Sequence, residues 1–144
     1  MKWVTRARPK TDRIACPWLI RRFIDPDAEI LYVPPTEVLQ RAEAEGAHSF
    51  DAPGTEFTRR DGKCSFEVLI DSFDLGSDHA LVRLAQVVHA ADIVEDVDAD
   101  PLGAGLRAIG EGGLDAEADD YQLLARGSFV YDALYAWCLR RVTD

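Results

Sequence analysis

The sequence predicts an α/β fold, with a small three-stranded parallel sheet in its N-terminal half and a helix-rich C-terminal half. Three short segments before residue 51 have the β-branched and aromatic composition of strands, at residues 3–5, 29–33 and 48–50. Segments with helical spacing separate them, and the β-α-β-α-β order indicates parallel strands joined by right-handed crossovers. After Gly62 only helical patterns follow. Residues 1–144 are expected to form a single domain.

The helices of the N-terminal half have recognisable ends. The first is expected to begin at Asp12 as its cap, to tolerate Pro17 in its early turns, and to stop before residue 25. The second is expected over residues 36–45, capped by Thr36 and terminated by Gly46.

The C-terminal half is predicted to hold four helices, over residues 65–73, from 77 or 78 to 91, over 102–109 and over 118–141. Gly110, Gly112 and Gly113 are expected to close the third of these, and Gly127 to break the last. An acidic loop is expected at residues 92–101. The last helix is expected to bury one stripe of side chains, namely Val130, Ala133, Leu134, Trp137 and Cys138.

Composition limits the function classes. The apolar fraction of 47% is that of a globular protein, and the chain has no apolar run long enough for a membrane span. A net charge of −10 argues against nucleic-acid binding. Because the N-terminus lacks the apolar segment of a signal peptide and the three cysteines form no disulfide pattern, a cytoplasmic location is expected.

Positive charge gathers at the N-terminus. Residues 1–22 contain seven of the 16 Lys and Arg residues but a single acid, Asp12. Such a local field attracts anions, and a helix beginning near Asp12 adds backbone N–H groups. Arg6 and Arg13 are the best candidates for anion binding because they flank the turn from the first strand to the first helix. The alternative is that the arginines solvate a helix and pair with the surplus acids.

Three residues are candidates for a metal site. His89 and Asp92 are three apart on one predicted helix, so their side chains share a face, and Glu67 lies on the preceding, antiparallel helix. Imidazole and carboxylate groups suit a divalent ion such as Zn, Mn or Fe. The alternative is a hydrogen bond on the helix surface. Cys64, expected at a helix N-terminus, is either a reactive thiolate or a buried structural cysteine.

Asp132 lies between aromatic residues of the last predicted helix, where an unpaired carboxylate would be costly. It is expected to form a buried pair with Arg13 or Arg22, the alternative being a solvated surface carboxylate.

Three segments resemble the bacterial chromate-resistance proteins of the ChrB type. They are residues 12–24 (DRIACPWLIRRFI), 64–67 (CSFE) and 131–138 (YDALYAWC). The resemblance implies a part in chromate resistance, a cytoplasmic setting and metal-linked chemistry or sensing. Longer relatives carry an additional N-terminal region credited with regulation, and because nothing precedes residue 1 here, a transcription-factor role is not expected.

The resemblance is incomplete at the metal site. Many relatives have a histidine after the paired acids, where this chain has Tyr121 after Asp119 and Asp120. The implied metal site therefore rests on Glu67, His89 and Asp92, and whether Tyr121 or Asp120 joins it stays open.

Two functions follow as hypotheses. In the first, the chain is a metal- or oxyanion-binding protein of the chromate response, whose arginines hold a small anion such as chromate or sulfate. In the second, it is a metal-dependent enzyme, hydrolytic or acting on reactive oxygen, that uses Glu67, His89 and Asp92. No nucleic-acid or membrane partner is expected, and the sequence leaves the oligomeric state open.

Overall fold

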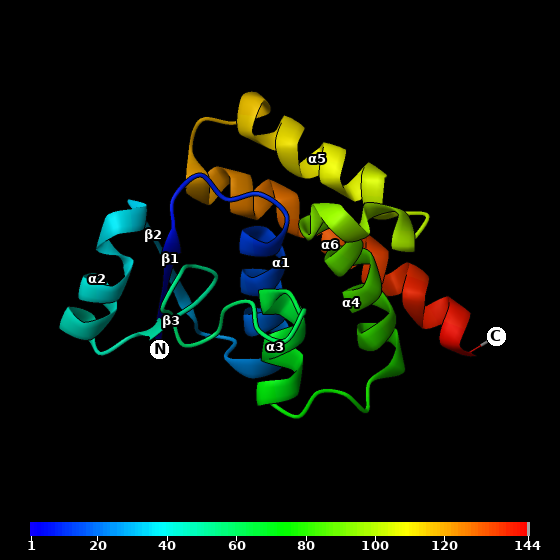
Figure 1. The fold of residues 1–144 in the computed structure, drawn as a ribbon, viewed down its shortest axis with the longest axis horizontal. Helices are drawn as coiled ribbons and strands as arrows, with labels where there is room; N and C mark the ends of the chain where they lie inside the picture. The colour runs from blue at the N-terminus through cyan, green and yellow to red at the C-terminus, as the bar shows by residue number, and fades with distance from the viewer. Residues whose placement is uncertain (144) are drawn as a thin grey trace.

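The computed structural model describes residues 1–143 and contains a three-stranded parallel sheet followed by an array of helices (Figure 1). The strands are β1 (Lys2–Arg6), β2 (Glu29–Val33) and β3 (His48–Ser49), in the order β2-β1-β3. The α-helices are α1 (Asp12–Leu19), α2 (Val38–Glu45), α3 (Ser65–Ser72), α4 (His79–Asp92), α5 (Gly103–Ala116) and α6 (Asp120–Thr143). The predicted fold class is confirmed.

Each face of the sheet packs against a different set of helices. In β1, Trp3 contributes to the main core, whereas the next residue, Val4, packs with Val38 and Ala42 of α2. This alternation follows from the two-residue period of a strand. Figure 1 accordingly shows α2 on one side of the sheet and α1 and α3 on the other.

Pro17 shapes the first helix. Because proline has no N–H, the carbonyl of Arg13 one turn earlier lacks its usual helical partner. The hydroxyl of Tyr32 on β2 donates to that carbonyl at 2.7 Å, which ties α1 to the sheet. The helix then widens into the π-helical turn η1 (Ile20–Ile24) and ends at Asp25.

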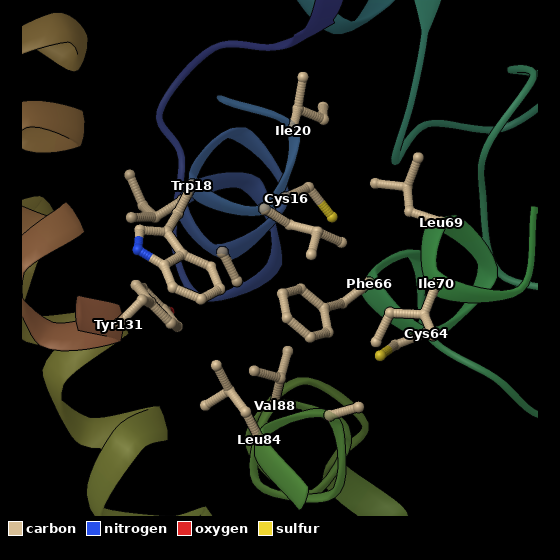
Figure 2. Close-up of a cluster of buried hydrophobic side chains, with 14 of the residues drawn as sticks. Cys16, Trp18, Ile20, Cys64, Phe66, Leu69, Ile70, Leu84, Val88 and Tyr131 are labelled. Carbon is tan, nitrogen blue, oxygen red and sulfur yellow. The ribbon is translucent and has the colours of Figure 1, made fainter. Parts of the chain in front are cut away.

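The main core joins the sheet to the helices of both halves. In Figure 2 the ring of Phe66, from α3, lies between α1 and α4, with Trp18 and Tyr131 nearby. Phe66 is fully buried, and Trp18 and Tyr131 are nearly so. The N-terminal and C-terminal halves therefore share one hydrophobic core.

Asp12 does not cap its own helix, contrary to expectation. Its carboxylate is completely buried and accepts hydrogen bonds from the backbone N–H groups of Ser65 at 2.9 Å and Phe66 at 3.2 Å. These are the first two residues of α3, so Asp12 caps a helix more than fifty residues away. Thr36 is also not a cap, because it lies in a 3-10 turn, η2 (Pro35–Glu37), before α2. Gly46 ends α2 in a left-handed conformation, as predicted.

The glycines do not interrupt the C-terminal helices. Helix α5 continues to Ala116, and α6 passes through Gly127 unbroken. A Cβ atom at Gly110 would lie 2.5 Å from the Thr11 side-chain oxygen, and one at Gly127 would lie 3.1 Å from Ile14. These glycines permit close approach between elements rather than ending helices. The expected acidic loop is largely a 3-10 segment, η3 (Val94–Ala99).

The buried stripe of α6 differs from the predicted one. Ala133 is exposed, and Val130, Leu134 and Trp137 are only partly buried. Cys138 is buried as predicted, and Tyr131 and Tyr135 are buried as well. Tyr131 donates to the Thr11 carbonyl at 3.0 Å, and Tyr135 donates to the Asp78 carboxylate at 2.5 Å.

Asp132 pairs with Arg22, one of its two expected partners, at 3.2 Å. The Trp18 indole also donates to it at 2.7 Å. The Asp132 side chain is 54% exposed, however, so the pair is a surface interaction and the expected burial is wrong. Among the described residues, no helix is both long and apolar enough to span a membrane.

Candidate functional site

A cavity of about 750 Å³ opens at the carboxyl ends of β1 and β3. The cavity lies at the carboxyl edge of the sheet, where ligands of open parallel sheets bind. We call it the arginine cavity, after the arginines on its wall. Its charged lining residues are Arg6, Lys10, Arg13, Asp51, Arg59, Asp92, Glu95, Arg107 and Glu111.

Arg6 and Arg13, the predicted anion-binding residues, both line this cavity and share one carboxylate. Their guanidinium nitrogens lie 3.7 Å and 3.6 Å from Asp51 Oδ2. Arg6 Nε also donates to the Asp51 carbonyl at 2.8 Å, and Ser65 Oγ donates to Asp51 Oδ1 at 2.8 Å. Burial, followed by the repulsion of Arg6, lowers the pKa of Arg13. The two cations are thus held close together by a single counter-charge.

Asp92 lies in the same cavity, paired with Arg59. Arg59 Nη2 donates to the Asp92 carboxylate at 2.8 Å and to its carbonyl at 3.1 Å. Burial and the nearby charge of Asp51 raise the pKa of Asp92, against the opposing effect of Arg59. This salt bridge connects the end of α4 to the loop after β3.

The cavity wall is positive relative to the rest of the chain. Five basic residues and four acidic ones line it, whereas the chain has 16 basic and 26 acidic residues. Among residues 1–143, Lys10 has no acidic partner in a salt bridge. The cavity wall thus carries more basic than acidic side chains, in contrast to the chain as a whole.

Unusual backbone conformations occur at the cavity wall. Thr11 has φ 39° and Asp51 has φ 49°, both in the region that favours glycine. For a β-branched residue such as Thr11 this conformation is a genuine outlier. Strained residues of this kind concentrate at binding sites, where the surrounding structure holds them in place.

Glu67 and His89 meet at a second location, as expected from their places on two neighbouring antiparallel helices. His89 Nδ1 lies 2.5 Å from Glu67 Oε1, and His89 Nε2 lies 2.6 Å from Asp96 Oδ2 on η3. Burial alone would lower the pKa of His89, but its hydrogen bonds to the carboxylates of Asp96 and Glu67 outweigh burial and raise the pKa. The third ligand-type atom here belongs to Cys64, and the three donor atoms lie within 4.8 Å of one another. We call Cys64, Glu67 and His89 the Cys64 cluster.

The remaining candidates lie elsewhere. Asp92 is engaged by Arg59 in the arginine cavity and is not a member of the Cys64 cluster. Asp120 pairs with Arg8 at 2.9 Å, and the Tyr121 hydroxyl accepts from the Tyr32 N–H at 3.1 Å, so both lie near the sheet. Cys64 does lie at the N-terminus of α3, but it is fully buried, and burial followed by the charges of Asp12 and Glu67 raises its thiol pKa. Of the two alternatives for Cys64, its burial and raised thiol pKa favour the buried structural cysteine over the reactive thiolate.

Sequence reasoning missed Asp51 and Arg59 as cavity residues. Asp51 directly follows the third strand, at the sheet edge where sites of parallel α/β proteins form, and this position was an available signal. Arg59 lies in an irregular loop, and no local pattern indicates that it reaches Asp92.

Fold and cavity together define a class, namely an α/β protein with an arginine-lined cavity at the carboxyl edge of a short parallel sheet. The family model described as "ChrB, C-terminal domain" matches residues 3–138, and the chain belongs to this family. The chain is also 39% identical over 136 residues to Protein ChrB of Cupriavidus metallidurans. That match covers 93% of this chain and 40% of the relative. No solved structure matches the chain.

Proposed function

We propose that this chain is an oxyanion-binding protein associated with chromate resistance, and that its arginine cavity holds chromate or sulfate. The association with chromate comes from its family, whose ChrB-type members it resembles in three motifs. The chain spans 40% of the length of Protein ChrB, so the proposal concerns this part alone. The free thiols Cys16, Cys64 and Cys138 suit the reducing cytoplasm, where we propose that it acts.

One observation carries the proposal: Arg6 and Arg13 line a cavity and share a single carboxylate. Each guanidinium has five N–H donors in a planar fork, and Asp51 occupies only some of them. A tetrahedral dianion offers acceptors for the rest through charge-assisted hydrogen bonds. Its two negative charges would also be attracted by the two guanidinium groups.

Isothermal titration of the untagged protein with sulfate, and then with chromate, tests this function. We expect one weak, salt-sensitive site. Arg13→Gln and Arg6→Gln should each weaken it about 10- to 100-fold, because a hydrogen bond to a charged group contributes about 1.5–3 kcal/mol. Arg41→Gln is the matched control, since Arg41 lies on α2, pairs with Glu45 and does not line the cavity. Unchanged affinity in the Arg6/Arg13 double variant would refute the proposal.

The alternative is a metal-dependent enzyme that uses Glu67, His89 and Asp92. The short distance between Glu67 and His89 favours it, but the pairing of Asp92 with Arg59 in the cavity does not. The variant Asp92→Asn distinguishes the two functions. It should abolish an enzymatic activity that needs all three metal ligands. It should leave sulfate affinity unchanged or raise it, because a negative charge is removed from the cavity.

A further inference from the structure

We infer that Cys64, Glu67 and His89 form a binding site for Zn²⁺, distinct from the arginine cavity. This inference goes beyond the proposed function, since it needs no oxyanion and uses no cavity arginine. The thiol, carboxylate and imidazole come from the N-terminus of α3 and from the last turns of α4.

The geometry suits a small ion. The sulfur, carboxylate oxygen and ring nitrogen all lie within 4.8 Å of one another. Bond lengths of about 2.0–2.3 Å in a tetrahedral site require ligand atoms roughly 3.3–3.8 Å apart. Glu67 Oε1 and His89 Nδ1, now 2.5 Å apart, need to separate by about one ångström, a shift that side-chain rotation provides.

Cys64 lies in the main hydrophobic core, and its side chain forms a capping box with Glu67 at the start of α3. It is the N-cap of α3, a position where Ser, Thr, Asp and Asn are preferred. The first two N–H groups of that helix are already satisfied by the Asp12 carboxylate, and the Cys64 N–H donates to Glu67 at 3.0 Å. As ligands, thiolate together with imidazole select zinc over manganese or magnesium.

Asp96 completes the arrangement outside the three ligands. Its carboxylate contacts Nε2 of His89 at 2.6 Å, the nitrogen opposite the one that faces Glu67. Metal-bound histidines generally donate their second N–H to a carboxylate in this way, which fixes the ring and strengthens the ligand. The carboxylates of Asp12 and Glu67 also place negative charge near Cys64, which favours a cation.

Access differs among the ligands. The side chains of His89 and Glu67 are 20% and 24% exposed, whereas Cys64 is fully buried. An ion can therefore enter from the solvent side. Three protein ligands with one side open to water is the arrangement of a zinc site that keeps an exchangeable position.

The test is a titration of untagged, chelator-treated protein with Co²⁺ as a spectroscopic probe, followed by competition with Zn²⁺. We expect one equivalent of Co²⁺ and a near-ultraviolet band from thiolate-to-cobalt charge transfer, which Zn²⁺ abolishes. Cys64→Ser should remove the band, and His89→Gln should remove stoichiometric binding. Asp96→Asn should weaken binding about 10- to 100-fold, as expected for a residue that orients a ligand.

Matched variants separate ligation from folding. His79→Gln changes an exposed histidine in the first turn of the same helix, and Cys138→Ser changes another buried thiol, so both should bind normally. Glu67→Gln keeps an acceptor for the Cys64 N–H and hence the helix cap, but removes the charge. It should remain folded by circular dichroism and lose metal affinity. The inference would be overturned if the wild-type protein bound no Zn²⁺, or if the charge-transfer band survived Cys64→Ser. Sulfate titration of the metal-free protein tests the oxyanion function separately.

Discussion

Asp12 shows how one side chain serves parts of the chain far apart in sequence. It is the first residue of α1, yet its buried carboxylate accepts from the first two N–H groups of α3 and from the Cys16 thiol. Burial, and then the charges of Asp92 and Asp51, raise its pKa well above the ordinary value. The cap therefore joins two helices through a carboxylate whose buried position disfavours its charged form.

The raised pKa of Asp12 predicts a pH dependence of stability. A carboxyl group with a raised folded-state pKa contributes stability that is present below its unfolded pKa and is lost as pH rises through the folded pKa. The wild type should therefore lose its advantage over Asp12→Asn as pH increases, because asparagine keeps one acceptor and does not ionise. Urea unfolding of both proteins between about pH 5 and about pH 9 measures this. A difference in free energy of unfolding that is constant with pH, or that grows, would contradict the prediction.

Among the secondary-structure elements, α5 depends most on close packing. Its glycines would be expected to end a helix, because glycine disfavours the helix interior by about 1 kcal/mol relative to alanine. The helix nevertheless runs from Gly103 to Ala116. At Gly110 the absence of a Cβ lets α5 contact Thr11, the strained residue on the wall of the arginine cavity. In α5, close packing against Thr11 thus outweighs the low helix propensity of glycine.

The contrast between Gly110 and Gly112 tests that account. Gly110→Ala should destabilise the fold by about 1–3 kcal/mol, because the new Cβ would lie 2.5 Å from Thr11 Oγ1 and 3.1 Å from its backbone nitrogen. Gly112→Ala, with no atom within 4 Å of the added Cβ, should be neutral or stabilise by up to about 1 kcal/mol. Thermal unfolding of the two variants beside the wild type gives the comparison. Equal effects of the two substitutions would show that helix propensity alone governs α5.

Across the whole molecule, charge is distributed unevenly. The chain has a net charge of −10, yet basic residues outnumber acidic ones on the wall of the arginine cavity. The sheet, α1, α4 and α5 each contribute charged residues to that wall, and the shared core keeps these elements in place. Occupation of the cavity by an anion should therefore stabilise the entire fold.

Sulfate is expected to raise the unfolding temperature more in the wild type than in Arg13→Gln. A ligand at 100 times its Kd adds about 2.7 kcal/mol, which amounts to several degrees for a protein of this size. Sulfate also stabilises proteins generally by exclusion from their surfaces, and Arg13→Gln retains that effect. The effect of specific binding is the difference between the two proteins in the sulfate-induced rise of unfolding temperature, each measured against chloride at equal ionic strength. The same sulfate shift in both would exclude binding through Arg13.

Much of the architecture follows from local pattern. The strand at residues 29–33 and the Gly46 helix end were predictable because alternation and capping act over a few residues. The short connection between two predicted antiparallel helices indicated that Glu67 could face His89, and the clustering of basic residues pointed to Arg6 and Arg13, which line the cavity. Each of these depends on neighbours in the chain or on one helix face.

Partner choice depended on contacts across the fold. Asp92 shares a helix with His89, but it forms a salt bridge with Arg59 of the loop after β3. The residue that lies close to His89 and Glu67 is instead Cys64, at the N-terminus of α3. Asp12 reaches Ser65 over 53 residues, and Tyr131 reaches Thr11 over 120. A sequence specifies which groups need partners, because buried polar groups must be satisfied. Which partner each obtains is decided by tertiary packing, because only there do the competing donors and acceptors have positions relative to one another.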